Sequence, residues 1–537
     1  MKTRKIIALC VCAAVVTASA GCTGGSGTKN SGSGNVEKLM NAQPAEVTMP
    51  IVETPVKMTV ASTISVTSAG QTFGLGDIEA FKELERRTGV QIEYQTVSEE
   101  KLSLLFASNN LPDMILTNWD NFGGTYKYAM DGQLIALDDL IMENSPDFLN
   151  VLKKDKSILD NTLDVDKHIY LYPFIRPEME LRVFEGFQIR RDWLEKLNLE
   201  IPQTVDDMYK VLKAFKENDP NGNGIQDETP IISDKKLPFM DHAMNWFGID
   251  AFYQENGQVK CGWLQPEYKE FLETMAKWYN EGLIDADYLT CDTTQFRSKA
   301  VNELAGVWYG RAAGTLGTLE AAMSSINPDF SIIGLPWLSK DANKAGYAMP
   351  SKYIDNVTNI GIAITSNCQH PDIAAKWCNY AYGKDGHLLF NFGIEGDSYT
   401  MEDGIPTYTQ QIMKNPNGLS VSEALSRYAI PGNYAMEQSI YYFDQFMTGS
   451  QKNAIDVWKK GDTGRTIPTL KYDQSELEYS NNLKNEISTY VAEMQSKIIV
   501  GKEPMSSYDG FIEEIKKMGI DRVVETIQQA YDRAEAN

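Results

Sequence analysis

Apolar and polar side chains alternate along Val90-Gln91-Ile92-Glu93-Tyr94-Gln95, which is the period of a half-buried β-strand. Residues 56–65 are rich in Val, Thr and Ile and predict a buried strand earlier in the chain. A helix is expected between the two strands, with Asp77 as its N-cap and Gly89 as its end. The region therefore alternates between strand and helix from its start.

The alternation continues with a helix around 102–106 and a short apolar strand around 114–116. Strand, helix, strand, helix, strand predicts a parallel sheet with right-handed crossovers. A second unit opens near Tyr172-Pro173, with a strand at 187–189 and a helix at 191–197. We therefore expect an α/β chain with two lobes.

The clearest helix of the sequence begins at Thr204. Thr204 and Asp207 resemble a capping box, and an apolar stripe follows through Met208, Val211, Leu212 and Phe215. The C-terminal third shows further helical stripes at 483–494, 511–518 and 523–531. No repeat of 20 to 50 residues is found in the sequence, so a solenoid or propeller is unsupported.

The composition limits the classes of partner. The chain has 537 residues, 42% of them apolar, which is enough to build more than one core. Its 73 acidic residues outnumber its 50 basic ones, giving a formal net charge of -23. Nucleic acid is therefore not an expected partner, because phosphate binding needs an excess of Lys and Arg.

The N-terminus reads as an export signal. Lys2, Arg4 and Lys5 precede an apolar run over 6–16, and small residues follow up to Ser19-Ala20-Gly21-Cys22. The last four residues resemble a lipobox, although Ser19 stands where Leu is usual. We expect residues 1–21 to be removed, Cys22 to carry lipid and a flexible tether to follow; the alternative is an ordinary signal with an incidental cysteine.

The remaining cysteines are Cys261, Cys291, Cys368 and Cys378. Two disulfides, one or none are all compatible with the sequence. None of the four lies in a CxxC pair, and the chain has only 4 histidines. A structural zinc site is therefore not expected.

A loop directly after the Thr204 helix has the spacing of a calcium site. It reads Asp219-Pro220-Asn221-Gly222-Asn223-Gly224-Ile225-Gln226-Asp227-Glu228-Thr229-Pro230. Oxygen ligands at positions 1, 3, 5 and 9 and a Gly at position 6 match the start of an EF-hand loop. Pro230 departs from the pattern at position 12, where Glu228 is the substitute; the alternative is an Asx-rich turn without an ion.

These features together resemble a known family, the large extracellular solute-binding lipoproteins of ABC sugar importers, which include alginate-oligosaccharide-binding proteins. The residues that carry the resemblance are the export segment with Cys22 and the stretches 191–194, 219–228, 392–396 and 519–533. The resemblance implies a type II periplasmic-binding-protein-like fold, with two lobes joined by crossover strands at a hinge and a helical C-terminal region. It also implies structural Ca²⁺ bound by Asp219, Asn221, Asn223, the Ile225 carbonyl, Asp227 and Glu228.

We place the three lobe crossings near Tyr172, Thr358 and Pro406. This divides the chain into a signal peptide (1–21), the lipidated Cys22 with its tether (22–50), an N-lobe and a C-lobe. The N-lobe takes residues 51–172 and 358–405. The C-lobe takes residues 173–357, with the calcium loop at 219–230, and residues 406–537.

A sugar exposes flat C–H faces edged by hydroxyl groups, so its binders combine aromatic rings with hydrogen-bonding side chains. Trp308 is the leading candidate, because 305–308 reads as a strand that ends at a loop. Core packing is the alternative for each ring alone, and Trp193 and Trp278 are assigned to the core. The other candidate ligand contacts are Trp119, Asp120, Tyr172, Trp246, Arg311, Tyr353, Glu395 and Tyr441.

The expected function is capture of an oligosaccharide, or another polar solute, and its delivery to the permease of an ABC transporter. We expect a monomer anchored by lipid on the outer face of the cell membrane, without catalytic activity. One alternative is a secreted carbohydrate-active enzyme, with Asp120 and Glu395 imagined as acid and base. Another is a surface adhesion or scaffold lipoprotein.

Overall fold

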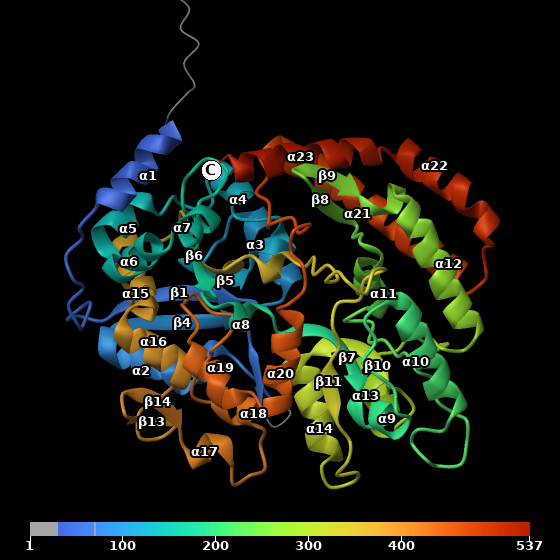
Figure 1. Cartoon of the computed structure of the whole chain (residues 1–537). Coiled ribbons are helices and arrows are strands. Elements are labelled where there is room, and N and C mark those ends of the chain that lie inside the picture. Colours follow the sequence, from blue (N-terminus) through green and yellow to red (C-terminus); the bar gives the residue numbers. More distant parts are fainter. Residues whose placement is uncertain (1–30, 69–70, 537) are drawn as a thin grey trace, which may run out of the picture.

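The computed structural model describes residues 31–68 and 71–536, so the predicted signal peptide and Cys22 lie outside the described residues. Two lobes lie side by side (Figure 1). The buried side chains of the first lobe come from 39–175 and 357–436. Those of the second lobe come from 181–353 and 443–531.

The first lobe is built on a five-stranded sheet with the order β4-β1-β5-β12-β6. Strand β1 (Val56–Ser62) pairs in parallel with β4 (Val90–Thr96) and with the central strand β5 (Met114–Asn118). Helices α2 (Glu79–Thr88) and α3 (Glu99–Ser108) connect these strands. The predicted strand and helix alternation is therefore confirmed.

Helix α2 ends as predicted but does not begin as predicted. Gly89 ends it in the left-handed conformation, with φ 72°, which glycine adopts without the steric cost of a Cβ. The N-cap is Ile78, which makes no side-chain cap. The predicted cap by Asp77 is wrong, because this carboxylate accepts from the Gly74 amide in the preceding turn.

Two strands carry the chain between the lobes. Strand β12 (Val357–Ile364) pairs in antiparallel fashion with β5 and with β6 (Tyr172–Ile175). A Cβ on Gly361 would lie 2.2 Å from the Tyr172 carbonyl oxygen, so only glycine fits at this close approach.

The second lobe contains a three-stranded antiparallel sheet, β10 (Val307–Arg311), β7 (Glu185–Arg190) and β11 (Ile332–Gly334). Helix α9 (Arg191–Lys196) follows β7, and α10 (Val205–Glu217) begins at Thr204, whose side chain accepts from the Asp207 amide. Helix α20 (Gly449–Trp458) also packs against this sheet. The predicted strand at 187–189, the predicted helix at 191–197 and the predicted helix that begins at Thr204 are confirmed.

Long helices extend the second lobe along one side of the molecule. They are α12 (Pro266–Asn280), α21 (Gln474–Ile499), α22 (Tyr508–Met518) and α23 (Ile520–Glu535). Figure 1 shows α21, α22 and α23 crossing the top of the view, and the end of α23 lies near residues 157–167 of the first lobe. The helical C-terminal region expected from the sequence is therefore present.

Two of the predicted segment assignments differ from the structure. Ser31–Asn41 forms helix α1, with Leu39 buried and the Asn35 Nδ2 2.6 Å from the Asp138 carboxylate, where a flexible tether was expected. Residues 406–436 pack in the first lobe, although the predicted crossing near Pro406 assigned them to the second. Apolar side chains of α18 (Val421–Leu425) and of 430–436 pack in the cores of the first lobe. The chain therefore leaves this lobe only after Met436.

The remaining elements are short and complete the two lobes. The helices are α1 (Ser31–Asn41), α4 (Tyr126–Met130), α5 (Asp138–Asn144), α6 (Pro146–Lys154), α7 (Lys156–Thr162), α8 (Met179–Arg182), α11 (Phe239–Ala243), α13 (Thr293–Val301), α14 (Thr318–Met323), α15 (Pro371–Asn379), α16 (Lys384–Phe392), α17 (Gln410–Met413), α18 (Val421–Leu425) and α19 (Ile440–Phe446). The strands are β2 (Val66–Ser68), β3 (Gln71–Phe73), β8 (Phe252–Glu255), β9 (Gln258–Cys261), β13 (Tyr399–Glu402) and β14 (Ile405–Tyr408). Cys261, Cys291, Cys368 and Cys378 form no disulfide.

Candidate functional site

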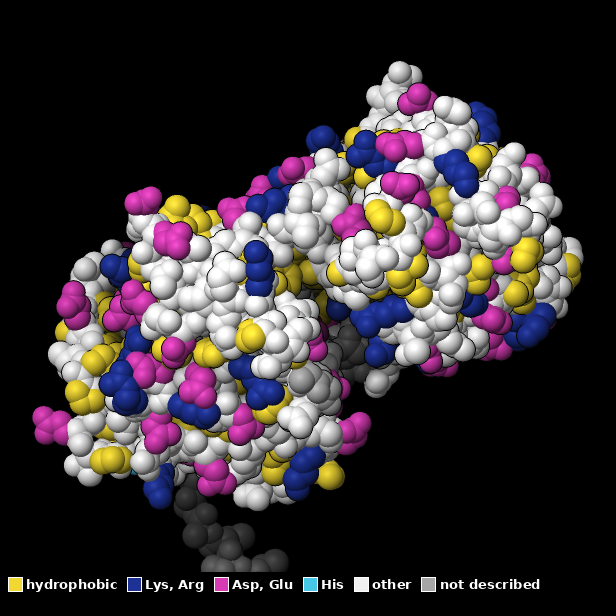
Figure 2. Space-filling view, turned by 90° about the horizontal axis from the view of Figure 1, so that it is seen from below, with side chains coloured by type: hydrophobic (Ala, Val, Ile, Leu, Met, Phe, Trp, Pro, Cys, Tyr) yellow, Lys and Arg dark blue, Asp and Glu magenta, His cyan; other side chains and the backbone are white. Residues whose placement is uncertain are grey.

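A pocket of about 170 Å³ lies where the two lobes meet. The first lobe lines it with residues from 120–126 and 161–173, the crossing strand β12 with 357–359, and the second lobe with 470–472. Seen from below, the molecule narrows between the two lobes (Figure 2). A ligand in this pocket contacts both lobes and one of the strands that join them.

Asp120 is the predicted ligand contact that lines this pocket. It follows β5 in a short helical turn over 119–122, so it projects from the C-terminal edge of the parallel strands. The Asn359 Nδ2 donates to its carboxylate over 2.6 Å, and the Asn118 side chain accepts from its amide. The carboxylate is exposed and remains an acceptor for hydroxyl groups.

Three tyrosines and a lysine supply the other chemistry of the pocket. Tyr126, Tyr170 and Tyr472 bring aromatic rings. The buried Lys471 donates to the carbonyls of Asn161, over 2.6 Å, and of Leu163, and burial lowers its pKa to about 8. These contacts fasten the 470–472 segment of the second lobe to the first, and the site combines rings with polar groups as a hydroxyl-rich solute requires.

Five predicted ligand contacts lie in the cores. The rings of Trp119, Tyr172, Trp246, Trp308 and Tyr353 are each at most 1% exposed. The Trp308 Nε1 donates to the Gln188 side chain over 2.7 Å, and the Tyr172 hydroxyl lies 2.8 Å from the Ser145 hydroxyl. A ring packed on all sides offers no face to a ligand in this conformation, and the structure does not bring these five together with Asp120 at the pocket.

The last three predicted contacts are exposed but lie apart from the pocket lining. Arg311, with 57% of its side chain exposed, ends β10 and faces Glu185. Tyr441 is in α19 and is 43% exposed. Glu395 is an exposed residue of the first lobe between α16 and β13.

The loop at 219–230 folds around its own side-chain oxygens. Asp219 accepts from the amides of Gly222, Asn223 and Gly224, over 2.9, 3.1 and 2.9 Å. The Asn221 side chain accepts from the Asn223 amide, and the Asn223 side chain accepts from the Ile225 amide. Gly224 has φ 81°, the left-handed conformation that the sharp turn at position 6 requires. The loop therefore curls inward around positions 1, 3 and 5.

Glu228 places a buried carboxylate in this loop. Its side chain is 1% exposed, and neither carboxylate oxygen has a hydrogen-bond partner among the described residues. Burial, with the nearby charges of Asp219 and Asp227, raises its pKa. An unpaired buried carboxylate is costly, so a bound cation fits this position.

The described residues contain no group of three or more His, Cys, Asp and Glu side chains placed to hold a metal ion. Half of the six predicted calcium donors are of other kinds, namely the side-chain oxygens of Asn221 and Asn223 and the Ile225 carbonyl. The donor set is thus one of mixed oxygens, which suits Ca²⁺ better than a transition metal.

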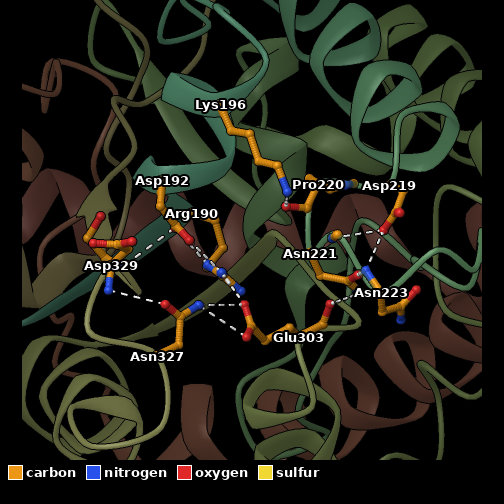
Figure 3. Close-up of polar contacts among 12 residues, drawn as sticks. Arg190, Asp192, Lys196, Asp219, Pro220, Asn221, Asn223, Glu303, Asn327 and Asp329 are labelled. Carbon is orange, nitrogen blue, oxygen red and sulfur yellow. Dashed lines mark hydrogen bonds and ion pairs between the residues drawn. The ribbon is translucent and has the colours of Figure 1, made fainter.

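The loop rests on a buried ion-pair network (Figure 3). The Asn221 Nδ2 donates to the Glu303 carbonyl over 3.1 Å. The Glu303 carboxylate accepts from Arg190, which is 0% exposed and also pairs with Asp192. Arg190 ends β7, so the loop is connected through Glu303 to the central strand of the second sheet.

His242 is a buried group whose titration affects stability. Its ring stacks on Tyr309 at 3.7 Å, and burial lowers its pKa to about 4 despite the opposing charge of Glu185. Between about pH 6.5 and pH 4 the unfolded chain binds a proton here that the folded chain does not, so stability falls as the pH falls through this window. We expect a loss of about 3 kcal/mol from this group.

The measurement is urea unfolding at pH 7 and pH 4 for wild type and His242→Gln. Carboxylates titrate in the same window, so the difference between the two proteins carries the information. The variant is expected to lose about 3 kcal/mol less than wild type over this range. His370→Gln removes an exposed histidine and is the matched control; equal pH profiles for all three proteins contradict the prediction.

The family of the chain follows from its sequence. The profile of the bacterial extracellular solute-binding protein family matches residues 73–387, more than half of the chain. The chain belongs to this family. The family resemblance inferred from the sequence is therefore confirmed, and in the described part of this solute-binding protein no helix has the length and apolar character needed to cross a bilayer.

Two curated relatives align over most of this solute-binding protein. The fructooligosaccharide ABC transporter substrate-binding protein FusA of Streptococcus pneumoniae is 26% identical over 98% of both chains. Lipoprotein LipO of Bacillus subtilis is 24% identical over 85% of this chain and 89% of its own length.

Solved structures of similar proteins share the fold. FusA of Streptococcus pneumoniae in complex with kestose has a TM-score of 0.72 at 23% identity, covering 90% of this chain and 100% of that one. The FusA EF-hand mutant in complex with fructo-nystose reaches 0.70 at 23% identity, with the same coverage. The alginate-binding protein AlgQ2 without calcium ion reaches 0.70 at 24% identity, covering 90% and 99%. The two-lobed solute-binding fold predicted from the sequence is confirmed.

The sequence reasoning missed Tyr126, Tyr170, Lys471 and Tyr472 of the solute-binding protein. Tyr126 is in the predicted loop region a few residues after Asp120, so proximity was a usable signal for it. The 470–472 segment has no such signal, because it meets the 120–126 segment only in the folded chain. The contact between segments so far apart in the sequence depends on how the two lobes pack.

Proposed function

We propose that this protein captures an oligosaccharide between its lobes and delivers it to the permease of an ABC transporter. The observation that carries the proposal is a pocket lined by both lobes and by a crossing strand, with tyrosines beside Asp120 and Asn359. Membership of the solute-binding family and similarity to FusA support the sugar as ligand. No feature of the pocket favours bond cleavage over binding.

Binding is proposed to work by closing the hinge. A ligand that contacts both lobes favours the closed conformation, which is the form the permease recognises. We propose that the chain crosses between lobes near Arg176, near Asn356 and between Glu437 and Tyr442. The Arg176 amide donates to the Asn356 carbonyl and Glu437 bridges to Ile175, so the three crossings lie together.

A saccharide at 100 times its Kd is expected to stabilise the protein by about 2.7 kcal/mol, without turnover. Thermal unfolding against a library of oligosaccharides measures the stabilisation, and chromatography of the same mixtures detects products. Cleavage of the stabilising sugar contradicts the proposal and supports an enzyme. Absence of stabilisation by every saccharide also contradicts it.

The proposed pocket is tested by Asp120→Ala, expected to weaken binding about tenfold by removing an acceptor for ligand hydroxyls. Asp131→Ala removes an exposed carboxylate of the same lobe outside the pocket and is expected to bind as wild type. Equal affinities of both variants place the ligand elsewhere.

We further propose that the 219–230 loop binds structural Ca²⁺ through Asp219, Asn221, Asn223, the Ile225 carbonyl, Asp227 and Glu228. The unpartnered Glu228 carboxylate and the inward-facing loop support this assignment. The FusA EF-hand mutant shows that a protein of similar fold has such a motif. The bound ion supplies charge for Glu228 and holds the loop in its turn.

We propose a monomer held at the outer face of the cell membrane by lipid on Cys22. The lipobox-like segment and the similarity to lipoprotein LipO support the anchor. Mass spectrometry of the protein from membranes measures the lipid directly, and an unmodified N-terminus without Cys22 contradicts it.

A further inference from the structure

Three cations gather where the crossings enter the second lobe. Arg176 follows β6, Lys352 lies in a short turn over 351–353 before β12, and Arg311 ends β10. The Lys352 ammonium donates to the Glu185 Oε1, and the Arg311 Nε lies 3.5 Å from the Oε2 of the same carboxylate. We call Arg176, Arg311 and Lys352 the basic cluster.

Arg176 lacks the partner that comparable arginines have. Its guanidinium lies 4.9 Å from the ring centroids of both Phe174 and Phe184, and its Nε is buried without a hydrogen-bond partner in the described part of the chain. Arg182 and Arg190, by contrast, each donate to named acceptors. A buried N–H donor without an acceptor is costly, so the Arg176 Nε calls for an acceptor from outside the described chain.

Glu185 holds the cluster together but does not neutralise it. Burial works to raise the pKa of Glu185, while Lys352, His242 and Arg311 hold it below its usual value. Burial lowers the pKa of Lys352, and the charges of Arg311 and Arg176 lower it further, so the three cations act on one another. One carboxylate among three cations leaves an excess of positive charge in a chain whose formal net charge is -23.

We propose that the basic cluster, none of whose residues lines the pocket, binds a carboxylate of an oligosaccharide that extends beyond the pocket, so that the captured ligand contains an acidic sugar. This inference rests on the proposed function. A guanidinium presents a planar fork that matches a carboxylate, and Arg176 and the half-exposed Arg311 can each offer one. Phe184, which also lies 4.9 Å from the Lys352 ammonium, provides an apolar surface beside the charges.

The experiment compares acidic oligosaccharides with neutral ones of the same linkage. Oligomers of galacturonic, glucuronic and mannuronic acid are tested beside their carboxyl-reduced counterparts by calorimetry on the full mature protein. An acidic oligomer is expected to bind at least tenfold more tightly than its reduced counterpart, because a hydrogen bond to a charged group is lost on reduction.

Variants then locate the carboxylate. Arg311→Gln is expected to lower the affinity for the acidic oligomer at least tenfold and to leave the affinity for the reduced oligomer unchanged. Arg176→Lys keeps the positive charge but loses the planar guanidinium. Its affinity for the acidic oligomer is expected to lie between those of wild type and Arg176→Gln. Arg191→Gln removes an exposed arginine beyond the other end of β7 and is the matched control.

The outcomes separate this inference from the proposed function. Tight binding of neutral oligosaccharides only, or equal weakening of both forms by Arg311→Gln, overturns the acidic-sugar assignment alone. A protein that binds no saccharide of either charge overturns the proposed function as well. Arg311 is exposed, so Arg311→Gln is expected to fold. If this variant unfolds at the same urea concentration as wild type, its loss of binding is local.

Discussion

Replacing Arg190 by methionine is expected to lower the free energy of unfolding by about 3 to 5 kcal/mol. Arg190 is 0% exposed and donates to Asp192 over 2.8 and 2.6 Å and to Glu303 over 2.7 Å (Figure 3). Methionine keeps most of the apolar stem but removes the guanidinium, which lies 4.7 Å from the Trp193 ring centroid and 4.1 Å from that of Phe330. It also leaves two largely buried carboxylates without their cation, and this unpaired charge is expected to cause most of the loss.

Arg191 is the matched control for this prediction. It is the next residue, carries the same charge and pairs with Glu195, but both side chains are about 60% exposed. Arg191→Met is expected to change stability by less than about 1 kcal/mol, because exposed ion pairs contribute little. Urea unfolding followed by circular dichroism measures both variants.

A double variant tests the cause of the loss. Arg190→Met combined with Glu303→Gln removes one of the stranded charges, so its destabilisation is expected to be smaller than the sum of the single variants. Equal losses for Arg190→Met and Arg191→Met, or strict additivity in the double variant, contradict the explanation by unpaired charge.

The fold was predictable because its elements carry local signals. The alternation along 90–95 predicts β4. Gly89 marks the end of α2, because a residue without a Cβ adopts the left-handed conformation readily. Thr204 caps α10, and the apolar stripe behind it is buried. The assignment of Trp193 and Trp278 to the core is also confirmed, since each is 1% exposed. Periodicity and capping are properties of a few neighbouring residues, which a sequence displays directly.

The pocket was predictable only at Asp120. Trp308 was expected at a loop after a strand, but β10 runs on to Arg311, so Trp308 lies inside the strand with its ring among the buried side chains of the lobe. The predicted crossing near Pro406 failed because α18 and the following segment pack on the first lobe. Lys471 and Tyr472 reach the pocket from the second lobe. Such placements depend on long-range packing, which has no period in the sequence.

Calcium is expected to stabilise wild type by about 4 kcal/mol when present at 1,000 times its Kd, and a chelator is expected to remove this gain. The expectation rests on the proposed metal loop. Glu228 supplies the physical reason, because its buried carboxylate has no partner among the described residues. Thermal unfolding of the mature protein in calcium and in chelator measures the difference.

Glu228→Gln separates the bound ion from other effects of calcium. Glutamine keeps the size of the side chain but removes the charge that the ion balances, so the variant is expected to lose most of the calcium response. In chelator the order is expected to reverse, with the variant at least as stable as wild type, because it no longer buries an unpaired charge.

The control is Glu217→Gln, which removes an exposed carboxylate of the preceding helix that pairs with Lys213. It is expected to keep the full calcium response. Because Asn221 donates to the Glu303 carbonyl, calcium binding and the Arg190 network share a contact, and their effects on stability are not expected to be independent. A wild type that unfolds identically in calcium and in chelator contradicts the metal site, whereas a full calcium response in both variants places the ion outside the 219–230 loop.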